Sequence, residues 1–219
     1  MRPRVSGSSE LIVVATPVGD AHVDLRRAAD RRATLVLGHG AGGGIGAADL
    51  LALADRLPPQ GIDVVRVEQP WIVAGRRVAA PPPTLDRAWL AVLEHLAVAG
   101  PLLVGGRSAG ARVACRTASQ VGAAGVLALA FPLHPPGRAE KTRLPELDLP
   151  AAAGLPTLVL QGTRDPFGGP ADIPAAPGRL VVPVEGGDHS FRVPKGVGGA
   201  PLAGLVAATL AWALEVATG

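Results

Sequence analysis

The sequence predicts an α/β fold in which a mostly parallel, doubly wound sheet carries helices on both faces. Short apolar runs alternate with longer segments of helical periodicity, as in strands joined by crossover helices. Of the 219 residues, 48% are hydrophobic and only 18% are charged, so the chain can bury a sizeable core. The 29 glycines concentrate where several apolar runs end. We expect residues 1–219 to form a single domain.

The elements follow from this periodicity. Residues 11–18 and 22–25 are two apolar runs separated by Gly19-Asp20, which favours an N-terminal antiparallel hairpin. Further strands are expected over residues 34–37, 62–67, 102–104, 125–131, 157–160 and 180–184. Helices are expected over residues 47–57, 84–97, 108–119 and 202–214. We expect Thr84 to cap the second of these, with Asp86 in its first turn.

Charge and cysteine content narrow the function classes. The net charge is +3, and no Lys/Arg run is longer than a pair, so nothing predicts a nucleic-acid partner. The single cysteine, Cys115, excludes an intramolecular disulfide and a cysteine-cluster metal site, and favours a reducing, cytoplasmic location. The last apolar run, residues 202–214, is shorter than the ~20 residues of a bilayer span, so we expect no membrane partner. The oligomeric state is left open.

A serine follows the strand at residues 102–104. Gly106-x-Ser108-x-Gly110 is a G-x-S-x-G pattern, and it lies between a predicted strand and a predicted helix. A sharp strand-to-helix turn would push Ser108 into the cleft, and glycines two residues to either side would let backbone pass closely. The alternative is a glycine-rich turn with a serine at the helix N-cap. The position between strand and helix favours a nucleophile.

A glycine-rich loop, residues 38–44, follows the strand at residues 34–37. In one interpretation its N–H groups form half of an oxyanion hole, with Ala41 and Ala109 as the two donors. In another, Gly38-x-Gly40-x-x-Gly43 is a dinucleotide fingerprint, with Glu68 as the ribose-binding acid. His39 and the surplus glycines are atypical of that fingerprint, and it leaves the remaining motifs unexplained.

An acid and a base follow two later strands. Asp165 comes directly after residues 157–160, and His189 lies on a glycine-rich loop after residues 180–184. An acid beside an imidazole can orient it, and the imidazole can then take a serine proton. Asp172 and Asp188 are the alternatives for the acid. Serine, acid and histidine thus occur in the order of an α/β-hydrolase, each after its own strand.

Five segments carry a family resemblance. They are residues 37–42, 105–110, 131–137, 161–167 and 187–191. In these segments the chain resembles the small, cap-less α/β-hydrolases labelled dienelactone-hydrolase-like, in particular a group with an animal testis-expressed member. The resemblance implies the α/β-hydrolase fold without a cap domain and a triad of Ser108, Asp165 and His189. Dienelactone hydrolases themselves use a cysteine nucleophile where this chain has Ser108, so their particular reaction does not carry over.

The expected function is acyl transfer to water on a small-molecule acyl substrate, as in a serine esterase or thioesterase, with no metal and no cofactor. A hydrolase-fold binding module with a vestigial site is the alternative. The interval at residues 132–156 is too short for a cap domain. Residues expected to contact substrate are Gly40, Trp71, Arg76, Arg107 and His134. For the loop at residues 69–83, a buried Trp71 beneath solvated arginines is the competing interpretation.

Overall fold

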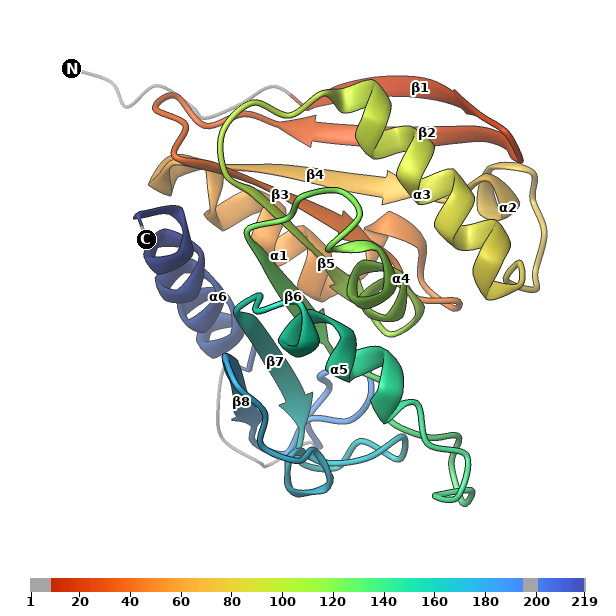
Figure 1. Cartoon of the computed structure of the whole chain (residues 1–219), viewed down its shortest axis with the longest axis vertical. Helices are drawn as coiled ribbons and strands as arrows, with labels where there is room; N and C mark the ends of the chain where they lie inside the picture. The colour runs from red at the N-terminus through yellow and green to blue at the C-terminus, as the bar shows by residue number, and fades with distance from the viewer. Residues whose placement is uncertain (1–8, 195–200, 219) are drawn as a thin grey trace.

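The computed structural model describes residues 9–194 and 201–218, which build an eight-stranded sheet between helices (Figure 1). The strand order is β1-β2-β4-β3-β5-β6-β7-β8. The strands are β1 (Glu10–Thr16), β2 (Gly19–Arg26), β3 (Ala33–Gly38), β4 (Ile62–Glu68), β5 (Leu102–Arg107), β6 (Gly125–Leu129), β7 (Thr157–Gly162) and β8 (Arg179–Val184). β1 and β2 form an antiparallel hairpin, β2 pairs antiparallel with β4, and all other neighbours are parallel. The predicted α/β-hydrolase fold is therefore confirmed.

Helices cover both faces of the sheet. α1 (Ala48–Arg56) and α6 (Pro201–Thr218) share one face. The opposite face carries α2 (Pro70–Val73), α3 (Pro82–Leu96), α4 (Ala109–Thr117) and α5 (Leu144–Ala152). Three short 3₁₀ turns, at Gly44–Gly46, Pro58–Gln60 and Pro170–Asp172, complete the elements. Between β6 and β7 the chain holds only α5, so among the residues that the structure describes no cap domain covers the carboxyl edge of the sheet.

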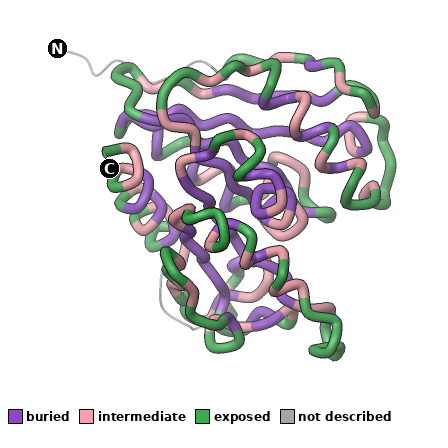
Figure 2. Tube along the Cα trace, viewed as in Figure 1, coloured by how far each residue is buried: buried purple, intermediate pink, exposed green. Residues whose placement is uncertain are grey.

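The core consists of two apolar layers, one on each side of the sheet. Alternation along β3 shows why: Leu35 and Leu37 pack into the layer beneath α1 and α6, whereas Val36 packs into the layer beneath α3 and α4. All residues of β3, β6 and β7 are buried, whereas much of the edge strand β1 is exposed (Figure 2). Parallel strands buried on both faces need continuous apolar runs, which is why these runs were visible in the sequence.

The start of α3 differs from the expectation. The helix begins at Pro82, so Thr84 does not cap it and Asp86 lies beyond its first turn. Proline suits the first helical positions because the N–H that it lacks would have no partner there. Asp86 instead forms an ion pair with Arg116 of α4, at 2.6 Å. The loop expected at residues 69–83 also contains the short helix α2.

The last helix is longer than expected. α6 has 18 residues with a mean hydropathy of 1.5, which makes it long and apolar enough to cross a membrane by length and composition. In the structure it packs against the sheet through Leu205, Trp212 and Ala213. The Trp212 ring lies over Gly125 of β6, where a Cβ would come within 2.9 Å of it.

Candidate active site

Ser108 occupies the turn between β5 and α4 in a strained conformation. Its φ is 53° and its ψ is −109°, a region that non-glycine residues rarely adopt. The two flanking glycines are required sterically. A Cβ on Gly106 would lie 2.4 Å, and one on Gly110 2.3 Å, from the carbonyl oxygen of Gly38 in β3. The close approach of β3 to the turn thus accounts for the G-x-S-x-G spacing.

Three side chains from three strand ends form one chain of hydrogen bonds. Ser108 Oγ lies 3.0 Å from His189 Nε2, and His189 Nδ1 lies 2.8 Å from an oxygen of Asp165. The Asp165 side chain has no exposed surface. Gly162 lets the loops meet, since a Cβ there would lie 2.3 Å from the Gly187 carbonyl oxygen. The arrangement matches a nucleophile, a base and an acid that orients the base.

Gln161 organises the acid and was not singled out by sequence reasoning. This fully buried residue of β7 accepts a hydrogen bond from the Phe131 N–H at 2.9 Å. Its Nε2 donates to Asp165 at 3.0 Å and to the Gly168 carbonyl at 2.6 Å. The Phe167 N–H also donates to Asp165, at 2.8 Å. The sequence offered one signal for this role, because Gln161 is a polar residue directly after the apolar run at residues 157–160.

Arg107 connects the serine turn to the histidine loop. Its guanidinium donates to the His189 carbonyl at 2.5 Å and to Ser190 Oγ at 2.8 Å. On its other side Nε faces the buried carboxylate of Asp49, at 3.3 Å. These contacts use Nε and one Nη of Arg107, and the side chain also lines the groove beside the histidine loop, so its contact with substrate stays a prediction. Burial raises the pKa of Asp49, and Arg107 opposes that rise.

The alternative acids lie elsewhere in the site. Asp188 accepts hydrogen bonds from the N–H groups of Ser190 and Arg192, which shape the histidine loop. Burial alone would raise the pKa of Asp188, but these bonds and the nearby Arg192 and Arg107 hold it below its ordinary value. Asp172 accepts from the Gly169 N–H at 2.8 Å, in a 3₁₀ turn. Of these three acids, Asp165 is the one that forms a hydrogen bond with the His189 ring.

The glycine-rich loop is held by a buried histidine. His39 Nε2 accepts from the Gln69 N–H at 3.0 Å, so Nδ1 carries the proton and donates to the Gly40 carbonyl at 2.8 Å. Burial lowers the pKa of His39 and keeps the ring neutral. Within residues 9–194 and 201–218, the N–H groups of Ala41 and Ala109 donate to no protein acceptor. Ala109 directly follows Ser108, and Ala41 and Ala109 both line one small cavity at the start of α4, so the assignment of their N–H groups to an oxyanion hole stays a prediction.

The dinucleotide interpretation fails on the geometry of the same loop. α1 begins at Ala48, ten positions after the end of β3, so the fingerprint glycines do not open a helix onto which a pyrophosphate could dock. Glu68, the expected ribose ligand, lies 3.6 Å from His22 in the hairpin.

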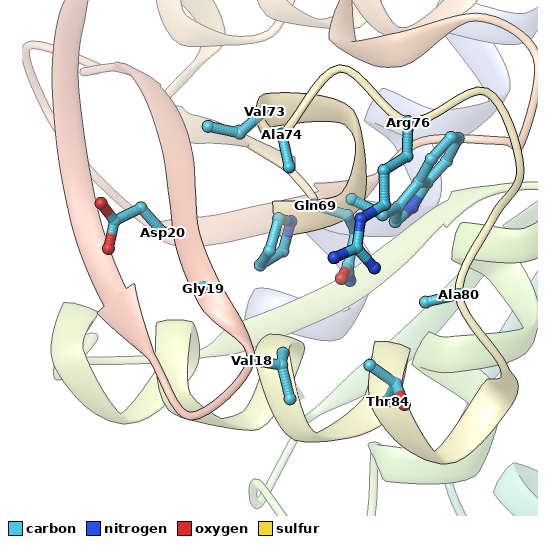
Figure 3. Close-up of a pocket in the computed structure, with 11 residues that line it drawn as sticks. Val18, Gly19, Asp20, Gln69, Val73, Ala74, Arg76, Ala80 and Thr84 are labelled. Atoms are coloured by element: carbon cyan, nitrogen blue, oxygen red, sulfur yellow. The ribbon is translucent and has the colours of Figure 1, made fainter.

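Of the remaining expected contact residues, Trp71 and Arg76 line one groove, whereas Gly40 lies by the serine and His134 by the acid loop. Gly40 packs against the serine, since a Cβ there would lie 3.4 Å from Ser108 Cβ. Trp71 is 6% exposed and stacks obliquely on His39 beside Ala41, so it is a wall residue. Arg76 is exposed and lines a groove of about 330 Å³ between α2 and the β1–β2 turn (Figure 3). His134 lies by Gly168, next to the acid loop.

Cys115 does not offer an alternative nucleophile. Cys115 is buried, and burial raises the pKa of its thiol to about 12, so it stays protonated. Among the described residues, no group of three or more His, Cys, Asp and Glu side chains is placed to hold a metal ion.

Comparisons with known proteins agree with the observed fold. The model of the alpha/beta hydrolase domain family matches residues 31–212. No curated protein matches the chain significantly in sequence. A lid-less α/β serine hydrolase from Xanthomonas campestris is 20% identical, with a TM-score of 0.73 over 98% of this chain and 97% of that one. Est1E from Butyrivibrio proteoclasticus, also solved with ferulic acid bound, is 13% identical, with a TM-score of 0.70 over 98% and 100%. A thermophilic esterase from Thermogutta terrifontis is 16% identical, with a TM-score of 0.67 over 94% and 99%.

Proposed function

This chain belongs to the α/β-hydrolase family, and from that premise we propose that it is a serine hydrolase acting on a carboxylic ester or a related acyl bond. The observation that carries the proposal is the hydrogen-bond chain from Ser108 through His189 to the buried Asp165. A binding module with a vestigial site would have no need to keep a nucleophile in a strained turn within 3.0 Å of an imidazole.

In the proposed mechanism Ser108 Oγ attacks the carbonyl carbon of the substrate. His189 Nε2 takes the hydroxyl proton as the new C–O bond forms, and the carbonyl π electrons move onto oxygen. The N–H groups of Ala41 and Ala109 stabilise that oxyanion. When the tetrahedral intermediate collapses, the bond to the leaving group breaks and His189 returns its proton to the leaving group. Asp165 accepts the hydrogen bond from His189 Nδ1 and holds the imidazole in this orientation.

The acyl-enzyme is then hydrolysed by the same groups. His189 takes a proton from water, and the hydroxide equivalent attacks the acyl carbon. Collapse breaks the ester to Ser108, and the proton returns to Oγ. No cofactor takes part in these steps. The proposal includes a small-molecule acyl substrate, membership of the cap-less dienelactone-hydrolase-like group, and a cytoplasmic location.

Turnover of p-nitrophenyl acetate by the full chain tests the proposal. We expect measurable hydrolysis that falls to background in Ser108→Ala and His189→Ala, each folded as judged by circular dichroism. Asp165→Asn should lower kcat by about 10⁴-fold, because the amide favours the wrong imidazole tautomer. Equal rates in the parent protein and Ser108→Ala would refute the proposal and favour the binding module.

A further inference from the structure

Phe167 is an aromatic residue that lies at the candidate active site and not in the core. The sequence has only three phenylalanines and no tyrosine. Of the described residues that form the two apolar layers, Phe131 and Phe191 are members, whereas the half-buried Phe167 is not. The Phe167 ring instead lies against the imidazole of His189, with 4.2 Å between the ring centroids and 33° between the ring planes. A scarce residue type is thus placed on the candidate base.

The backbone of Phe167 is held on both sides. Its N–H donates to Asp165 Oδ1 at 2.8 Å, and its carbonyl oxygen accepts from the His134 N–H at 3.1 Å. The next residue, Gly168, has a φ of 115°, and its carbonyl oxygen accepts from Gln161 Nε2 at 2.6 Å. Phe167 therefore contacts the acid through its backbone and the base through its ring, and both contacts come from a well-held loop.

The hydrogen bonds of His189 hold its backbone and the edge of its ring. Arg107 donates to the His189 carbonyl, which fixes the backbone. The bonds to Ser108 and Asp165 are made by the two ring nitrogens, so they lie in the plane of the imidazole. A tilt of the ring changes the angles of these bonds before it changes their lengths, so the bonds oppose small tilts weakly. The contact with Phe167 bears on a face of the ring and opposes such a tilt directly.

We propose that Phe167 is a positioning residue for the catalytic base, and that it keeps the imidazole plane aligned with both Ser108 and Asp165. The proposal rests on the proposed function and adds a residue to its machinery. In the proposed mechanism His189 becomes an imidazolium when it takes the serine proton. The face of an aromatic ring attracts a cation that lies within about 6 Å of its centroid, so the same contact also favours the charged form of the base.

Steady-state kinetics on p-nitrophenyl acetate test this role. Phe167→Ala should lower kcat by about 10-fold to 10²-fold, because a misplacement of about 1 Å in a catalytic group can cost about 10²-fold in rate. KM should stay within about twofold of the parent value, since acylation and deacylation use the same base and slow together. Phe167→Tyr keeps the aromatic ring and should retain the parent kcat within about twofold.

Leu155→Ala is the matched control. Leu155 is also half-buried and apolar, but it precedes the amino end of β7, whereas Phe167 follows the carboxyl end of the same strand. The control should lower the free energy of unfolding in urea and leave kcat unchanged. If Phe167→Ala does not fold, Phe167→Leu takes its place, because leucine keeps the apolar character of the side chain but has no ring.

Proton NMR tests the contact itself. The ring current of Phe167 should shift the imidazole proton resonances of His189, whose ring lies 4.2 Å away. These resonances are identified as the ones that disappear in His189→Gln. They should move in Phe167→Ala, and they should stay near their parent positions in Phe167→Tyr and Leu155→Ala. A loss of general stability alone would not produce this pattern.

The outcomes separate this proposal from the proposed function. Turnover by Phe167→Ala with the parent kcat would overturn the positioning role and leave the serine hydrolase intact. A raised KM with unchanged kcat would do the same, and would make Phe167 a substrate contact. Unmoved His189 resonances in Phe167→Ala, or an equal loss of kcat in Leu155→Ala, would also overturn it. A parent protein that neither hydrolyses the ester nor reacts with a fluorophosphonate at Ser108 would instead refute the proposed function.

Discussion

Replacing Arg107 should lower both the stability of the protein and its kcat, because this guanidinium contacts both a buried carboxylate and the histidine loop. A second substitution, at Asp49, should restore the stability but not kcat. It faces the buried Asp49 carboxylate at 3.3 Å and donates to the His189 carbonyl at 2.5 Å. Arg107→Ala leaves Asp49 as a buried charge without its counterion. It also removes the contact that ties the histidine loop to the serine turn.

The expected magnitudes follow from those contacts. Removing one partner of a buried ion pair costs about 3–5 kcal/mol of unfolding free energy. The double variant Arg107→Ala/Asp49→Asn removes the charge as well and should recover about 2 kcal/mol or more. A misplacement of about 1 Å in a catalytic group can cost about 10²-fold in rate, so kcat should fall by that order in both variants. Stability is thus rescued and turnover is not.

The pH dependence has a defined sign. Burial raises the pKa of Asp49 in the folded state, and Arg107 opposes that rise, so Arg107→Ala should raise the pKa further. A carboxyl whose folded pKa exceeds its unfolded pKa disfavours folding when ionised, and this penalty shrinks as pH falls below the folded pKa and is gone below the unfolded pKa. The stability gap between Arg107→Ala and the parent protein should therefore narrow from pH 7 towards pH 5.

Urea denaturation at both pH values and steady-state kinetics on p-nitrophenyl acetate measure these effects. The coupling energy from the double-mutant cycle should exceed about 1 kcal/mol. The reasoning is refuted if the stability losses of Arg107→Ala and Asp49→Asn simply add in the double variant, or if Arg107→Ala keeps the parent kcat.

Three further predictions concern the scaffold of the site. Gly110→Ala should lower the free energy of unfolding by about 3 kcal/mol or more in urea denaturation, because the added Cβ would lie 2.3 Å from a carbonyl oxygen of β3. The control is Gly204→Ala, which is also in a helix but has open space around the added Cβ, and it should raise the free energy of unfolding by about 0.5–1 kcal/mol. Similar effects at both sites would contradict the steric argument. Gln161→Leu should lower the free energy of unfolding by about 2–4 kcal/mol and also lower kcat, since it leaves the Phe131 N–H without its acceptor and removes a hydrogen bond to Asp165. Parent-like kinetics would show that Asp165 does not need this hydrogen bond. Because the pKa of His39 is lowered in the folded state, His39 binds a proton more readily in the unfolded chain, so the free energy of unfolding should fall as pH drops below about 6.5. A pH series on His39→Gln should show a shallower fall.

The meeting of Ser108, Asp165 and His189 was predictable because each follows its own strand of one parallel sheet. Carboxyl ends of parallel strands gather at one edge, so adjacency in space follows from alternation in sequence. The strand runs themselves were visible because buried parallel strands are continuously apolar. A strand buried on both faces can therefore be recognised from its own apolar run, without knowledge of the rest of the fold.

Contacts made by long side chains could not be predicted in the same way. Arg107 was expected to contact substrate, and only the structure shows that its guanidinium also reaches Asp49 on α1 and the loop after β8. Gln161 acts through four backbone and side-chain partners brought together only by the fold. The start of α3 was predicted two residues too late because an N-cap threonine and a proline in the first turn are competing signals for a helix start. Here the helix begins at the proline, Pro82.

Covalent labelling tests the central claim most directly. The full chain would be treated with a fluorophosphonate probe, and intact mass would be measured for the parent protein, Ser108→Ala and His189→Ala. The account predicts one adduct on Ser108 in the parent protein, none in Ser108→Ala, and strongly slowed labelling in His189→Ala. A parent protein that stays unlabelled, or an adduct that persists in Ser108→Ala, would contradict it.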